Sequence, residues 1–163
     1  MEFSQLLGEV DSVFSRGSSL VEVHKAIRDL HVFDREFSDK GIVDYFGSSD
    51  WSVRVFQNPV SYVLRRQLKW NGYNRVAAPD GGSLSDLLEF VDLWSSQNAR
   101  GSEVSLGLQR FLQHEVAVDG SIHFQGQLSY SDKWASVYAV LSFPPVSLEV
   151  RVGLLPVSAS KVA

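Results

Sequence analysis

The chain has no cysteine among its 163 residues, which excludes disulfides and thiolate metal sites. This composition is typical of a reducing compartment, so we expect an intracellular location. The chain also lacks any apolar run near the roughly 20 residues that a membrane-spanning helix needs. Its first residues lack the basic start and apolar run of a signal peptide. The sequence therefore predicts no membrane span.

Positive charge is scarce except in one stretch. The net charge is −4, which argues against nonspecific binding of DNA or membranes by the whole surface. Residues 51–78, however, carry five basic residues and no acidic one, whereas the segments on both sides are net acidic. We call residues 51–78 the basic strip. A local positive strip between two acidic segments indicates a contact with a partner or with this chain's own acids.

The N-terminal segment shows helical patterns. Its apolar residues recur at helical spacing from Phe3 to Phe14 and predict a first helix. Ser19, followed three residues later by Glu22, is typical of a helix N-terminus. Lys40-Gly41 reads as a helix stop, so residues 1–47 are expected to form a helical segment.

The rest of the chain predicts strands, two helices and strands again. The basic strip reads as paired strands, with Asn71-Gly72 as a hairpin turn that pairs Trp70 with Tyr73. Ser83 is a good N-cap with Asp86 in the first turn, and helices are expected over 83–98 and 102–114. Alternation after residue 114 predicts antiparallel strands over 116–155. No internal repeat is apparent.

These patterns predict a single α+β domain over residues 1–163. We expect an antiparallel sheet packed on two central helices, with the N-terminal helices at another edge. Residues 1–47 would form the helical N-terminal segment, and residues 51–163 would form the α+β core.

The histidines do not form a catalytic or metal-binding pattern. His24 and His31 are seven residues apart on one expected helix, too far to share a metal. His114-Glu115 begins like a zinc-protease helix, but position 118 is Val. His123 lies in no recognisable cluster. We therefore expect a protein that is not an enzyme, with no catalytic residue, metal or cofactor.

The basic strip holds the candidate binding residues. They combine five cations with two aromatic side chains: Arg54, Arg65, Arg66, Lys69, Trp70, Tyr73 and Arg75. In one interpretation the aromatic faces stack on bases and the cations hold phosphates. In the other, the aromatic residues pack on helices, and the cations meet acidic helices of this chain or of a neighbour.

Residues 79–94 (PDGGSLSDLLEFVDLW) and 101–112 (GSEVSLGLQRFL) follow a strand pair and precede antiparallel strands. Over residues 60–155 this order resembles the core of rhabdovirus matrix proteins. The resemblance implies self-association, condensation of a nucleocapsid, no catalysis and a location in the virion. It assigns no individual functional residue.

We therefore expect a structural, self-associating protein whose partners are other copies of itself and a ribonucleoprotein or RNA. The opposite charges of the N-terminal segment and the basic strip predict head-to-tail contacts between molecules. Removing residues 1–40 should then abolish association and leave residues 51–163 folded. Two alternatives stay open. One is a nucleic-acid-binding module built on residues 51–78. The other is a cone-shaped α+β pocket enzyme or ligand binder, which needs a histidine or carboxylate on the concave face of its sheet.

Overall fold

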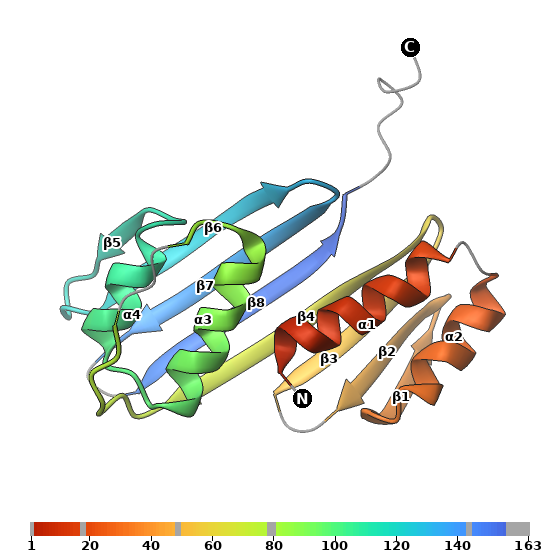
Figure 1. The fold of residues 1–163 in the computed structure, drawn as a ribbon, viewed down its shortest axis with the longest axis horizontal. Coiled ribbons are helices and arrows are strands. Elements are labelled where there is room, and N and C mark those ends of the chain that lie inside the picture. The colour runs from red at the N-terminus through yellow and green to blue at the C-terminus, as the bar shows by residue number, and fades with distance from the viewer. Residues whose placement is uncertain (1, 17–18, 48–49, 78–80, 143–144, 156–163) are drawn as a thin grey trace, which may run out of the picture.

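The computed structural model describes residues 2–16, 19–47, 50–77, 81–142 and 145–155. The described helices are α1 (Phe3–Ser15), α2 (Leu20–Asp29), α3 (Leu84–Ser96) and α4 (Gly101–Leu108). The described strands are β1 (Phe33–Asp39), β2 (Ile42–Gly47), β3 (Trp51–Gln57), β4 (Val60–Trp70), β5 (His114–Val116), β6 (Ile122–Tyr130), β7 (Lys133–Leu141) and β8 (Val146–Leu154). Every pairing is antiparallel, in the order β1-β2-β3-β4-β8-β7-β6-β5 (Figure 1).

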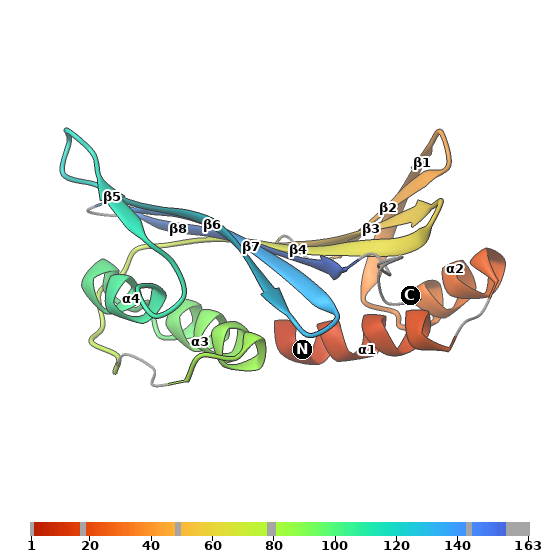
Figure 2. The ribbon, with the colours of Figure 1, turned by 90° about the horizontal axis from the view of Figure 1, so that it is seen from above.

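All four helices lie on one face of this sheet, and no described element covers the other (Figure 2). The two ends of the sheet bend away from the helices, so the uncovered face is concave. The expected sheet packed on two central helices is therefore wrong. The expectation placed the N-terminal helices at another edge, whereas α1 and α2 lie in the same layer as α3 and α4 (Figure 2). It also omitted strands β1 and β2.

The expected helical segment 1–47 is also wrong beyond Asp29, because β1 and β2 form a hairpin there. Lys40 and Gly41 have φ angles of 52° and 82°. Two positive φ angles in succession are typical of a two-residue turn between antiparallel strands. The dipeptide that reads as a helix stop is thus the turn of this hairpin.

The predicted hairpin at Asn71-Gly72 is wrong as well. Gly72 has a positive φ of 76°, but Asn71 has none, and a type I′ turn needs both. Trp70 pairs instead with Val146 on β8. The predicted helix 83–98 is confirmed as α3, where Ser83 forms a capping box with Asp86. The predicted helix 102–114 is confirmed only in part, because α4 ends at Leu108 and His114 begins β5. The predicted turn at 79–82 falls partly on residues that the structure does not describe.

The order helix, helix and four strands occurs twice, and the two halves join where β4 pairs with β8. The sequences of α1 and α3 support a repeat, because six of their thirteen aligned positions are identical. These pairs are Ser4 and Ser85, Leu6 and Leu87, Leu7 and Leu88, Val10 and Val91, Asp11 and Asp92, and Ser15 and Ser96. The expectation of no internal repeat is therefore wrong.

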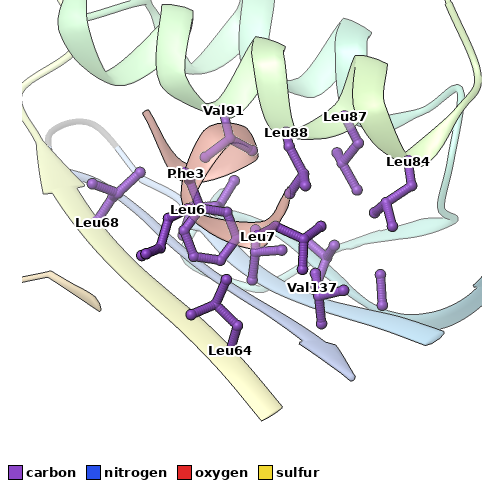
Figure 3. Packing of buried hydrophobic residues seen from close by; sticks show 14 of the residues in the cluster. Phe3, Leu6, Leu7, Leu64, Leu68, Leu84, Leu87, Leu88, Val91 and Val137 are labelled. Carbon is purple, nitrogen blue, oxygen red and sulfur yellow. The ribbon is translucent and has the colours of Figure 1, made fainter. Parts of the chain in front are cut away.

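The core fills the space between the helices and the sheet (Figure 3). Side chains of α1 and α3, such as Phe3 and Leu87, lie beside those of β4 and β7, such as Leu64 and Val137. Phe3, Leu64 and Leu87 have no exposed surface. Burying one such side chain contributes about 1.5–3 kcal/mol. The N-terminal helix is thus part of the common core.

Candidate interaction surface

The concave face of the sheet, which we call the open face, carries the side chains that alternate with the core. In β4, for example, Tyr62 and Leu64 are buried among the helices, and Val63 and Arg65 point the other way. The apolar and aromatic residues of the open face lie on both halves. They are Phe37, Ile42, Phe46, Phe56, Val63, Trp134, Tyr138 and Val140.

The N-terminal half of the open face combines aromatic and apolar side chains with charged ones. Phe37 is 61% exposed, and its ring meets that of Phe46 edge-on at 5.7 Å. The guanidinium of Arg35 lies 5.5 Å from the centre of the Phe46 ring. Asp44 pairs with Arg54 at 2.7 Å on the same face. Exposed aromatic rings around one ion pair are typical of a protein–protein contact surface.

The C-terminal half of the open face is more polar. Strand β6 contributes Gln125, Gln127 and Ser129. Trp134 lies over Gly153, where an added Cβ would be 2.6 Å from the indole. Tyr138, on the same strand as Trp134, is 47% exposed. Two aromatic side chains thus lie among polar neighbours, and Tyr138 is directly opposite Glu149 of β8.

The predicted basic strip is divided between the two faces of the sheet. Arg54, Arg65 and Lys69 belong to the open face, whereas Arg66 and Trp70 point toward the helices. The Nη2 atom of Arg65 lies 2.9 Å from a carboxylate oxygen of Glu149 on β8. Arg54 and Arg65 therefore meet acids of this same chain, although these acids lie on strands β2 and β8 and not on helices as the second interpretation expected.

Arg66 joins the two halves of the molecule. Its side chain is only 11% exposed, and it pairs with Asp50 at 3.2 Å and with Asp92 on α3. Asp92 also accepts a hydrogen bond from the backbone N–H of Phe3, at 3.1 Å. The carboxylate thus caps the first turn of α1 from another helix. Arg66 is a structural residue that cannot reach a phosphate.

The remaining residues of the predicted site do not form one surface either. Trp70 is 7% exposed, and its indole N–H donates to the carbonyl of Ala99 at 3.0 Å. Tyr73 and Arg75 follow β4 and are both exposed, Tyr73 to 64%. Trp70 is a core residue, so it cannot stack on a base.

Asp11 on α1 makes a second buried polar contact. It accepts a hydrogen bond from the Tyr62 hydroxyl at 3.0 Å and pairs with Lys133 on β7 at 3.1 Å. Burial, together with the negative charge of Asp11, raises the pKa of Tyr62 well above its usual range. The acidic N-terminal helix therefore packs on the sheet of its own molecule. Among residues 1–50, the acids that pair with arginines of the basic strip within the same molecule are Asp44, with Arg54, and Asp50, with Arg66.

His24 and Tyr45 form a hydrogen-bonded pair in the N-terminal half. The Tyr45 hydroxyl lies 2.6 Å from Nδ1 of His24, and only a neutral imidazole can accept its proton there. Burial lowers the pKa of His24, and the nearby Arg28 lowers it further. The pair ties α2 to β2 as a neutral contact.

His123 is the histidine that a pocket enzyme would need, because it points to the open face opposite Glu115. Its Nε2 lies 2.8 Å from the Ser121 hydroxyl, which lies 2.6 Å from a carboxylate oxygen of Asp119. The hydroxyl must donate to the carboxylate, so His123 donates to Ser121 and cannot remove its proton. The same hydrogen bonds lower the pKa of Asp119. The chain Asp119–Ser121–His123 holds the turn before β6.

Sequence reasoning missed the open-face residues of β1 and β2 because it read this segment as helical. Neither strand shows the strict alternation of apolar and polar residues that indicates a half-buried strand. Within the described ranges, no group of three or more His, Asp or Glu side chains could hold a metal, and no helix is long and apolar enough to cross a membrane.

No family model, curated protein or solved structure matches the chain. The resemblance to rhabdovirus matrix proteins covers the elements from β4 to β8. Apart from β4, these elements are the second copy of the order helix, helix and four strands, which also occurs in the first half of the chain.

Proposed function

We propose that the chain is a non-enzymatic structural protein that acts through protein–protein contacts, including contacts between its own copies. The observation that carries this proposal is the open face. A sheet of eight strands has all its described helices on one side. The other side presents aromatic rings, of which Phe37 and Tyr138 are 61% and 47% exposed.

The composition of the open face supports a protein partner. Large aromatic side chains are enriched in the centres of protein–protein contacts, where they displace water at a low cost in conformational entropy. Ion pairs such as Asp44–Arg54 neutralise the charges between the rings. A partner that covers this part of the face would therefore bury these charges as pairs.

The polar contacts of the histidines support a role without catalysis. His24 is hydrogen-bonded to the Tyr45 hydroxyl, and His123 donates to Ser121. His114 packs against the ring of Phe124, with ring centres 5.4 Å apart. Each of these side chains has a structural contact that accounts for its position.

Nucleic-acid binding through residues 51–78 has less support than protein binding. It requires cations that are free to neutralise phosphates, yet Arg54, Arg65 and Arg66 pair with acids of this chain. The aromatic side chain that would stack, Trp70, is buried. A salt titration of binding to single-stranded RNA tests this alternative directly, and steeply salt-dependent binding would favour it.

Sedimentation velocity over a wide range of protein concentration tests the proposal. We expect the average mass to rise above the 18.2 kDa of one chain. Replacing Phe37 and Phe56 by Ser should weaken association through the open face. Leu106→Ser is the matched control, because Leu106 is 57% exposed on α4, on the helical layer. A mass that stays at that of one chain at all concentrations contradicts the proposal.

A further inference from the structure

The outer edge of β6 is left without a neighbouring strand along most of its length. Strand β5 pairs only with Ile122, His123 and Phe124. Beyond Phe124, no strand among the described residues pairs with the outer side of β6, and Figures 1 and 2 show no described segment along it. We call residues 125–130 the free edge.

The turn to β7 fixes which backbone groups of the free edge point outward. Tyr130 and Lys133 close a two-residue turn, and such a closing pair exchanges hydrogen bonds. Pairs along an antiparallel ladder alternate, so Gly126, Leu128 and Tyr130 bond to β7. The N–H and C=O groups of Gln125, Gln127 and Ser129 therefore point away from the sheet.

The opposite edge of the sheet is protected in the ways that natural sheets use. Strand β1 carries Asp34, Arg35, Glu36 and Asp39, and its register shifts at a bulge between Phe33 and Arg35. Charged side chains and bulges prevent a second strand from pairing. The free edge has the sequence QGQLSY, without a charge or a proline. The β1 edge of this sheet is thus protected against pairing with another strand, and the free edge is not.

We propose that the free edge binds the free edge of a second copy of this chain, so that two molecules share one continuous antiparallel sheet. The proposal rests on the self-association proposed above and assigns one of its contacts to this edge, in addition to the open face. The two-fold axis passes beside Leu128, which lies opposite Leu128 of the second copy. Gln127 of each copy then pairs with Ser129 of the other copy, and these two pairs form about four backbone hydrogen bonds in total.

The side chains favour a second copy in this register. Half-buried Leu128 meets an identical apolar side chain at a non-hydrogen-bonded position, where side chains are closest. Tyr130 lies opposite Gly126 of the second copy, where Leu112 fills the space above the glycine and offers an apolar contact. Like charges do not face each other, because the free edge has none. In a register with Gln127 opposite Gln127 of the second copy, Tyr130 of the second copy would lie opposite Phe124. His114 of β5 already occupies that position, so this register is excluded.

Cysteine cross-linking tests the register, because the chain has no cysteine of its own. In the proposed dimer the two Cα atoms at position 128 are about 4.5 Å apart, within the range that a disulfide bridges. Leu128→Cys should therefore oxidise to a covalent dimer. Tyr130→Cys is the matched control and should stay monomeric on a denaturing gel, since its counterpart is Gly126.

Proline substitution tests the hydrogen bonds. Gln127→Pro removes an outward N–H that the single molecule does not use, and it should weaken the dimer at least about tenfold, because two symmetric hydrogen bonds are lost. Ser38→Pro makes the same change at an outward N–H of β1 and should leave association unchanged. Circular dichroism establishes that both variants are folded.

The outcomes separate this proposal from the proposed function. If Gln127→Pro is folded and associates like the unmodified chain, the site at the free edge is wrong and self-association stands. If Gln127→Pro does not fold, the cross-link at position 128 decides. If Leu128→Cys and Tyr130→Cys form covalent dimers to the same extent, the proposed register is wrong. An unmodified chain that stays monomeric overturns both proposals and leaves the free edge to a different protein.

Discussion

The two halves of the molecule share an order of elements and differ in what they present to solvent. The helices α1 and α3 agree at core positions, as Leu6 and Leu87 show. The open face carries Phe37 and Phe46 among charged residues in the first half and is mostly neutral polar along β6 in the second. The repeat thus keeps side chains that build the core and varies those on the open face.

The polar contacts of the core also differ between matched positions. Asp92 pairs with a buried arginine and caps α1, whereas Asp11, its counterpart, pairs with Lys133 and Tyr62. Both carboxylates lie where a helix meets the sheet. The same residue thus performs two different structural tasks, because the strands opposite the two helices carry different side chains.

Deletion of residues 1–40 tests whether the two halves fold independently, and it should have the largest effect on folding. We expect the remainder to unfold, because α1 caps the shared core with Phe3, Leu6 and Val10, all fully buried. This replaces the expectation that residues 51–163 stay folded alone. Far-ultraviolet circular dichroism and a thermal melt measure the result. A truncated protein with a cooperative melt would show that the second half is a self-sufficient unit.

Matched core substitutions sharpen the comparison. Leu6→Ala and Leu87→Ala each remove a fully buried side chain and should each cost about 2–5 kcal/mol. Because one core joins the halves, both should shift the same single transition in a denaturant titration. Two transitions, with each variant moving only one of them, would mean that the halves unfold separately.

Matched acidic substitutions should have unequal effects. Asp92→Ala leaves Arg66 nearly buried beside fewer partners and exposes the start of α1, so it should cost about 3–5 kcal/mol. Asp11→Ala should cost about 1–2 kcal/mol, because Lys133 keeps its contact with Asp132. Denaturant unfolding of both variants measures the difference. Equal losses would contradict the role assigned to Arg66.

The His24–Tyr45 pair predicts a modest pH dependence that belongs to the first half, since the matched position in α4 is Ser105. The pKa of His24 is lower in the folded chain than the ordinary 6.5. The unfolded chain therefore binds more protons below pH 6.5, and stability falls as pH drops from 6.5 toward the folded pKa. Thermal melts between pH 7.5 and 5 measure this slope.

His24→Gln should flatten that slope, because the amide oxygen can still accept from Tyr45 without titrating. His31→Gln is the control, since His31 is exposed and lies outside the pair. An unchanged slope in His24→Gln would show that other groups set the acid sensitivity.

Local patterns in the sequence predicted part of this fold. The spacing of apolar residues and the caps at Ser19 and Ser83 located the helices, and both caps form the expected hydrogen bonds. Alternation located β6, β7 and β8. These signals succeed because a helix start or a half-buried strand depends on neighbours a few residues away.

Such local patterns could not predict the order of the strands in the sheet. Arg65 meets Glu149 only because β4 lies beside β8, so the fate of the basic strip depends on a pairing 84 residues apart. Strand β1 carries too many charges to read as a strand, yet charges belong on an edge. A comparison of the α1 and α3 sequences reveals the repeat. The strands that follow α4 in the second half then predict strands after α2, in residues 33–47 of the first half.

The joining of two similar but non-identical units in one chain, with β4 paired to β8, gives the molecule two different ends. Two separate, identical units would have identical ends, whereas this chain has charged residues and a bulge at the β1 edge and neither at residues 125–130 of β6. In the proposed dimer, strand addition would therefore proceed at one end only. The β1 edges would then end the sheet, so that growth stops at a sixteen-stranded pair (two sheets of the order seen here) and does not continue into a fibre.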